Sequence, residues 1–191
     1  MIQSWLHHAE LASAQLPNGK RLFQAYAALL DFVWQNDWTG ACHDSSAALY
    51  MILNEMGFSP KLVTGEVKAD SGTFDHSWIE LDGKIFDVAV GFPSEDGHHV
   101  GPSVFASLNL ETGKPTELEF GVRSPNGLDP AGKFVASSDL EQYSLAQPEG
   151  MTIWDLAPRI GAACGVKVRK ADLRRKYGKL TRIVRGQAAP I

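Results

Sequence analysis

The stretch GACHDSSAALYMILNEMG, residues 40–57, decides the fold, because it predicts a helix that begins beside a cysteine. Apolar side chains recur in it at helical spacing, at Ala48, Leu49, Ile52, Leu53 and Met56. Gly57 closes the segment, since glycine commonly follows the last residue of a helix. Cys42 then falls at the helix N-terminus, where unpaired N–H groups and a partial positive charge stabilise a thiolate.

Strands are predicted on the C-terminal side of this helix. The run KLVTGEV, residues 61–67, predicts one strand, and residues 76–81 and 84–90 predict a hairpin across the turn dipeptide Asp82-Gly83. On the N-terminal side, apolar positions at helical spacing predict two helices separated by the turn signal Pro17-Asn18-Gly19. We therefore expect helices packed against an antiparallel sheet.

The predicted hairpin brings His76 close to Asp87. A two-residue turn places Trp78 opposite Asp87, and His76 opposite Ala89. His76, Trp78 and Asp87 then project from one face of the sheet. His76 and Asp87 become diagonal neighbours with Cα atoms about 7–8 Å apart, a gap that an imidazole and a carboxylate can bridge. Cys42, a histidine and a carboxylate in this chain order form a nucleophile, a base and a group that orients the base.

Three stretches within residues 38–90 carry a resemblance to a known superfamily. Gly40-Ala41-Cys42 runs into the predicted helix, and MGFSPKLVTG, residues 56–65, follows it as a turn into a strand. HSWIEL, residues 76–81, is similar to an H-x-W-x-E strand, with Asp87 on the next strand. In this order the stretches resemble the transglutaminase-like superfamily of papain-type cysteine enzymes.

The resemblance implies an α+β fold of the papain-like or transglutaminase-like type, with N-terminal helices and the nucleophile helix packed on an antiparallel sheet. It implies Cys42 as the nucleophile, His76 as the general base and acid, and Asp87 as the orienter. The implied activity is cleavage or transfer of an amide or acyl group, of the peptidase or amidase type. The alternatives are a non-catalytic binding module on the same fold and an acyl transferase that cross-links proteins. No cofactor and no metal are expected.

A second donor for the oxyanion is expected upstream of Cys42. Gln35, Asn36 and Trp38 are the candidates, and the sequence does not choose among them. Trp78, two residues after His76, is a further candidate for substrate contact.

The residues that follow Cys42 are expected to serve the helix. Adjacent helical side chains point in different directions, so His43 is a poor partner for the Cys42 thiol. Asp44 suits the positive end of the helix dipole and is expected to cap it. His98-His99 could indicate a metal site, but no second ligand pair at zinc spacing accompanies them.

The charge of the chain is unevenly distributed. Residues 1–158 hold 8 Lys and Arg against 21 Asp and Glu, a net charge of −13, whereas residues 159–191 hold 10 Lys and Arg against one Asp, a net charge of +9. We therefore divide the 191 residues into a transglutaminase-like cysteine enzyme domain, 1–158, and a basic C-terminal segment, 159–191, packed on the same domain. Residues 91–150 hold 6 of the 10 prolines and 8 of the 18 glycines, which predicts loops and short strands before a helix at 151–163.

The composition also bounds the partners. No run of 18 apolar residues predicts a membrane span, no signal peptide is visible, and two cysteines make no disulfide scaffold, so a cytoplasmic location is expected. Residues 167–185 could attract an anionic partner or dock on the acidic domain. Nucleic acid is disfavoured, because Tyr177 is the one aromatic residue among these basic residues. The expected substrate is a peptide, a protein or a small amide.

Overall fold

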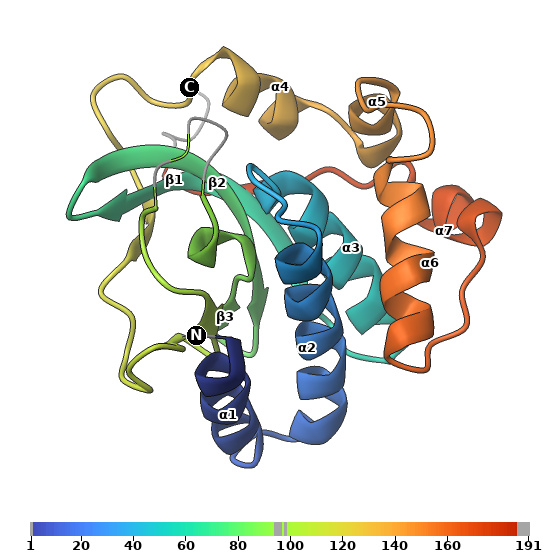
Figure 1. Cartoon of the computed structure of the whole chain (residues 1–191). Helices are drawn as coiled ribbons and strands as arrows, with labels where there is room; N and C mark the ends of the chain where they lie inside the picture. Colours follow the sequence, from blue (N-terminus) through green and yellow to red (C-terminus); the bar gives the residue numbers. More distant parts are fainter. Residues whose placement is uncertain (1, 94–96, 98, 187–191) are drawn as a thin grey trace.

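The computed structural model describes residues 2–93, 97 and 99–186, and over them the chain has a mixed α+β fold, as predicted (Figure 1). The seven α-helices of this part are α1 (Ile2–Ser13), α2 (Gly19–Gln35), α3 (Cys42–Glu55), α4 (Pro130–Ser137), α5 (Leu140–Leu145), α6 (Ile153–Ala163) and α7 (Lys170–Tyr177). The strands are β1 (Lys61–Ala69), β2 (Gly72–Leu81), β3 (Lys84–Phe86), β4 (Val104–Phe105), β5 (Leu108–Asn109), β6 (Glu119–Val122) and β7 (Ile183–Val184). A single turn of 3₁₀ helix, η1 (Ala89–Gly91), follows β3.

The main sheet is antiparallel except at one strand. Its order is β3-β2-β1-β6, and β7 pairs with β1 in parallel. The long β1–β2 ladder runs from Lys61 opposite Glu80 to Ala69 opposite Gly72, so both strands extend beyond the predicted ones. The β4–β5 hairpin forms a separate small sheet. The core strands therefore come from residues 61–86, with later segments added at the β1 side.

The predicted turn and register between β2 and β3 are confirmed, but the second strand is shorter than predicted. Asp82 and Gly83 both have positive φ, 50° and 73°, as a two-residue type I′ turn requires, and Leu81 lies opposite Lys84. The prediction of a strand over 84–90 is wrong beyond Phe86. There the Asp87 side chain accepts the Val90 N–H at 3.2 Å and turns the chain into η1.

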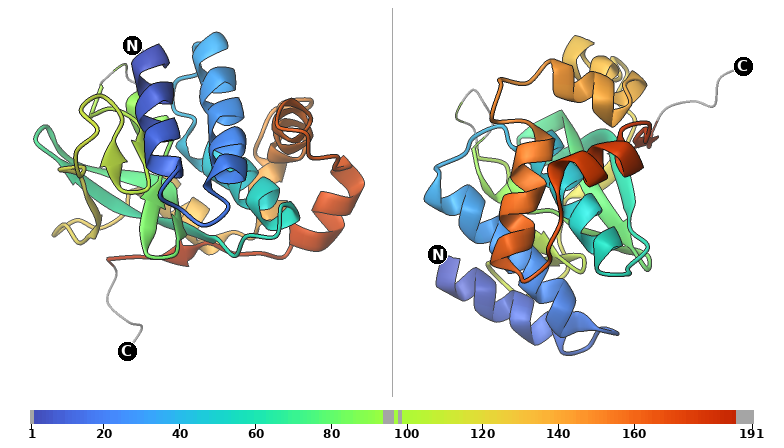
Figure 2. Two further views of the ribbon diagram at one scale, coloured as in Figure 1. Left: turned by 90° about the horizontal axis from the view of Figure 1, so that it is seen from below. Right: turned by 90° about the vertical axis from the view of Figure 1, so that its right-hand side faces the viewer.

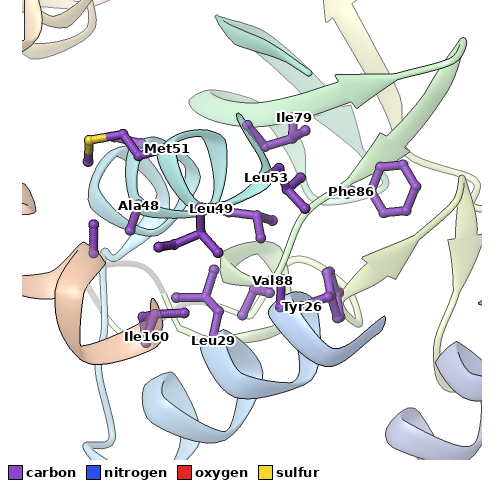
Figure 3. Close-up of a cluster of buried hydrophobic side chains, with 14 of the residues drawn as sticks. Tyr26, Leu29, Ala48, Leu49, Met51, Leu53, Ile79, Phe86, Val88 and Ile160 are labelled. Carbon is purple, nitrogen blue, oxygen red and sulfur yellow. The ribbon is translucent and has the colours of Figure 1, made fainter. Parts of the chain in front are cut away.

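One hydrophobic core joins the helices to the sheet. Figure 3 shows side chains of one buried cluster, among them Leu29 of α2, Leu49 of α3, Ile160 of α6, and Ile79 and Phe86 of the hairpin. All the apolar positions predicted for the nucleophile helix are buried. Because burying one large aliphatic side chain stabilises a fold by about 1.5–3 kcal/mol, this packing fixes α3, and with it Cys42, against β2.

Other helices surround this core. The two predicted N-terminal helices are α1 and α2, which pack against each other (Figure 2), and the predicted helix at 151–163 is α6. Helices α4, α5 and α7 were not predicted, because each has eight residues or fewer and its apolar pattern is too short to recognise. Among the described residues, no helix combines the length and the apolar character needed to cross a bilayer.

Gly91 at the end of η1 offers a test of the packing that holds Asp87. A Cβ at Gly91 would lie 2.6 Å from the backbone nitrogen of Ser103, whereas one at Gly101 would meet only Leu118 side-chain atoms, the nearest at 3.6 Å. We expect Gly91→Ala to lower the free energy of unfolding by about 1–3 kcal/mol, because the backbone must shift. Gly101→Ala is the matched control, and urea denaturation measures both. Equal stabilities would contradict the close approach.

Candidate active site

Cys42 is the first residue of α3. Gly40, with φ of 65°, turns the chain into the helix, and its N–H donates to the Pro93 carbonyl at 3.1 Å. Among the described residues, the Cys42 N–H has no backbone acceptor, as expected for the first turn of a helix. That N–H is available to an oxyanion formed beside the sulfur.

His76 and Asp87 form a buried pair. Their Nε2 and Oδ2 atoms are 2.6 Å apart, and the side chains are 5% and 2% exposed. The second Asp87 oxygen accepts the Val90 N–H, and the Asp87 carbonyl accepts a hydrogen bond from the Tyr26 hydroxyl at 3.0 Å. Asp87 is therefore held on both its side chain and its backbone, and it fixes the orientation of the His76 ring.

The thiol of Cys42 and the ring of His76 shift each other's proton affinity. Cys42 is half-buried, and its partial removal from water by itself raises the pKa of the thiol. The charges of His43 and His76 and hydrogen bonds from both rings outweigh burial and lower this pKa well below its ordinary value. Burial by itself lowers the pKa of His76, but Asp87 and Cys42 raise it to about 10. These shifts favour a thiolate beside an imidazolium.

His43 is a participant that the sequence reasoning missed. Its Nδ1 lies 2.8 Å from the Ser77 hydroxyl, and its ring also hydrogen-bonds the Cys42 thiol. The expectation that His43 is a poor partner for the Cys42 thiol disagrees with this influence of its ring on the thiol pKa. Ser77 lies between His76 and Trp78 in β2, and its side chain points to the opposite face of the strand. The ring of His76 therefore contacts Asp87, whereas the neighbouring Ser77 contacts the ring of His43. No sequence motif indicates the contact between His43 and Ser77.

The thiol opens into a cavity of about 460 Å³. Its described lining residues are Gly40, Ala41, Cys42, Ser71, Gly72, Thr73, Phe74, Asp75, His76, Ala89, Val90, Phe92, Pro93, His99 and Val100. Cavities of this size accept small molecules or short stretches of chain. The first turn of α3, the free end of β2 and the segment after Asp87 therefore converge on one space.

The prediction that Asp44 caps α3 is wrong. The helix start has no side-chain cap, and Asp44 instead accepts hydrogen bonds from the Tyr143 hydroxyl at 2.5 Å and from Gln147 at 2.6 Å. Burial, the largest influence, raises the pKa of Asp44 to about 6. Asp44 thus anchors the first turn of α3 to the α5 region.

Arg182 reaches the same turn from the basic segment. Only 4% of the residue is exposed, its Nη2 donates to the His43 carbonyl at 3.2 Å, and its guanidinium lies 4.4 Å from the centre of the Tyr143 ring. Within the described residues its Nε and Nη1 have no partner. A buried guanidinium therefore stands behind the nucleophile helix, where its charge also attracts a Cys42 thiolate.

Other basic residues of this segment pair with carboxylates of residues 1–158. The pairs are Lys170–Asp155, Arg174–Glu141, Lys176–Glu55, Lys179–Asp139 and Arg185–Glu80. Their basic members are about half exposed or more, so each pair contributes little to stability. In the structure the basic segment thus lies on the acidic part of the same chain.

The other predicted site residues lie elsewhere. Gln35 donates to Asp31 of the same helix, Asn36 at the C-terminal end of α2 donates to the Phe32 carbonyl, and Trp38 packs on Phe32. None of the three lines the Cys42 cavity, so their assignment as oxyanion donors has no support in the structure. Helix geometry explains this, because an amide side chain at a helix C-terminus readily bonds its own preceding turn.

Trp78 lies outside the lining of the Cys42 cavity, whereas His99 belongs to it. Trp78 is 1% exposed and packs in a second apolar cluster with Val63 and Val67, away from the cavity lining. His98 lies outside the described residues, and His99 borders the Cys42 cavity. The position of Trp78 therefore gives no support to its predicted contact with substrate.

The arrangement brings together a thiol with a lowered pKa, an imidazole oriented by a carboxylate, a helix N–H and a cavity. Comparisons with protein-family models, with curated proteins and with solved structures found no match for this chain.

Proposed function

We propose that the chain is a cysteine hydrolase of the transglutaminase-like type that cleaves an amide or a related acyl bond. The observation that carries the proposal is the buried His76–Asp87 pair, whose histidine lines the same cavity as the Cys42 thiol and lowers the pKa of that thiol. Cys164, which is half-buried like Cys42, has a raised pKa because burial acts on it without a histidine beside it, so the lowered pKa of Cys42 comes from its neighbours.

In the proposed reaction the Cys42 thiolate attacks the substrate carbonyl carbon and forms a tetrahedral oxyanion beside the Cys42 N–H. His76 gives its proton to the leaving amine as the carbon–nitrogen bond breaks, which leaves a thioester on Cys42. His76 then takes a proton from water, the hydroxide attacks the thioester, and the carboxylic acid leaves as the thiolate returns. Asp87 holds the ring in position through both steps.

Alkylation by iodoacetamide tests the nucleophile. At a pH of about 6.5, we expect Cys42 to react about tenfold or more faster than Cys164, because only Cys42 has a lowered pKa. Mass spectrometry of tryptic peptides measures the two rates in one sample. Cys164→Ala is the matched control and should leave the Cys42 rate unchanged. Similar rates at the two cysteines would contradict the proposal.

Acyl transfer to Cys42 tests the chemistry itself. With p-nitrophenyl acetate we expect a burst of p-nitrophenolate stoichiometric with the protein, and an acetyl group on Cys42. The burst should disappear in Cys42→Ala. Decay of the acetyl group with release of acetate indicates hydrolysis, whereas decay only after an added amine indicates an acyl transferase and would overturn the assignment as a hydrolase.

A further inference from the structure

Among the described residues, the edge of β2 beside the cavity has no neighbouring strand over part of its length. β3 pairs with β2 only from Leu81 to Ile79, and Phe86 is the last residue of β3 opposite β2. β2 itself continues to Gly72, seven residues beyond Ile79, with β1 on its other side. Residues 72–76 therefore have a strand neighbour on one side and the cavity on the other.

The backbone direction along β2 follows from the hydrogen bonds of β3. Asp87 exchanges both backbone hydrogen bonds with Val104, and the Ile85 carbonyl accepts the Ser107 N–H. The backbone groups of Asp87 and Ile85 therefore point away from β2. Lys84 and Phe86, which alternate with them, point towards β2 and pair with Leu81 and Ile79.

The same alternation fixes the direction of the other β2 residues. Since Ile79 and Leu81 direct their N–H and C=O groups towards β3, so do the odd-numbered residues Thr73 and Asp75. The even-numbered residues face β1, and the Thr64 hydroxyl donates to the His76 carbonyl from that side. Within the described residues, Thr73 and Asp75 meet no strand on the cavity side. Up to four backbone groups thus face the cavity, one residue and three residues from His76.

The surroundings suit an extended chain. Thr73 is exposed, and the cavity walls include the apolar side chains of Ala41, Phe74, Val90 and Val100. The Asp75 carboxylate is already occupied, because it accepts the Asp129 N–H at 2.8 Å, so the backbone of Asp75 rather than its side chain is available to a ligand. An exposed strand edge is a template for a further strand.

We propose that Thr73 and Asp75 receive the main chain of an extended peptide substrate as an added strand, which delivers the scissile carbonyl to Cys42. This inference rests on the proposed function and narrows its substrate to polypeptide. Recognition comes from the peptide backbone, and the apolar cavity walls favour uncharged side chains next to the scissile bond.

The test compares reagents that differ in their backbone amides. The probes are acetyl-Ala-Ala-Phe chloromethyl ketone, three analogues each N-methylated at one amide, and iodoacetamide. With the peptide probe the thiolate displaces chloride and forms a thioether, which mass spectrometry locates on Cys42. We expect at least one N-methylated analogue to react with Cys42 about tenfold more slowly than its parent, because methylation removes a strand hydrogen bond.

A backbone variant provides the second arm. Proline removes the N–H but is tolerated on an open strand edge, so Thr73→Pro should slow the peptide probe about tenfold and leave the iodoacetamide rate unchanged. Glu149→Pro is the matched control, since Glu149 precedes Gly150 (φ 77°) in an exposed turn, and both rates should stay at the wild-type value.

The outcomes separate this inference from the proposed function. If all three methylated analogues react with wild-type protein as fast as the parent, or the parent does not react at Cys42, the strand inference is overturned, whatever the fold of Thr73→Pro. If iodoacetamide does not distinguish Cys42 from Cys164, the proposed function itself fails.

Discussion

Replacement of His76 by alanine is expected to raise the pKa of the Cys42 thiol and to lower the rate of acyl transfer by about 10²–10⁴-fold. The variant removes the charge and the hydrogen bond that His76 supplies to the sulfur, while burial continues to raise the thiol pKa. It also removes the proton donor for the leaving group. His43 remains beside the sulfur and continues to lower the thiol pKa, so the rise should be smaller than if both rings were removed.

The pH dependence of Cys42 alkylation measures this effect. In the wild type the reactive ion pair forms as the pH rises through the lowered pKa of Cys42, and it is lost as His76 deprotonates near a pH of about 10. The raised pKa of His76 also makes its protonated ring stabilise the fold. That stabilisation is complete below the unfolded pKa of about 6.5 and is lost as the pH rises through about 10.

His7→Ala is the control, because His7 is exposed on α1, away from the cavity. It should match the wild type in both limbs of the profile. An Asp87→Asn variant should lie between the wild type and His76→Ala, because the ring keeps its place but loses the carboxylate that raises its pKa. An unshifted acid limb in His76→Ala would contradict the ion pair.

Arg182→Met is the second variant with a large expected effect. It removes the hydrogen bond to the His43 carbonyl, the contact with the Tyr143 ring and a buried positive charge near Cys42. We expect the free energy of unfolding to fall by about 1–3 kcal/mol and the pKa of Cys42 to rise. The pKa of Asp44 should rise above about 6 as well, because Arg182 is one of the charges that lower it.

Two further variants separate the charge of Arg182 from its shape. Arg182→Lys keeps the charge and should retain more of the lowered thiol pKa than Arg182→Met, although it loses the planar stack on Tyr143. Arg175→Met is the exposed control and should change stability by no more than about 0.5 kcal/mol. Thermal melts and the alkylation profile measure all three. If Arg182→Met matches Arg175→Met in both, Arg182 has no role at the site.

Local patterns predicted the elements that carry the proposed nucleophile. The 3.6-residue period of residues 40–57 located α3, because its apolar stripe packs into the core. The Asp82-Gly83 dipeptide located the turn and the register, because few residues tolerate positive φ at two successive positions. From these two features the sequence placed Cys42 on a helix start and His76 near Asp87.

Contacts between distant segments were beyond the sequence. The contact of the Val90 N–H with the Asp87 side chain after the end of β3 is local, but the pairing of Asp87 with Val104 joins two segments that are separate in the sequence. The His43–Ser77 contact and the approach of Arg182 to α3 likewise join segments 34 and 139 residues apart. Gln35 and Asn36 were misjudged because proximity in sequence to Cys42 says little about where a side chain at a helix end turns.

The separation of 139 positions between His43 and Arg182 sets an order of events during biosynthesis. During translation the segments that form α3, β1, β2 and β3 leave the ribosome long before the segment that forms β7. N-terminal segments begin to fold first. Until residue 182 emerges, the first turn of α3 lacks its buried guanidinium, and β1 lacks its parallel neighbour β7. A nascent chain therefore carries Cys42 without the full set of charges that surrounds it in the folded protein until residue 182 has emerged.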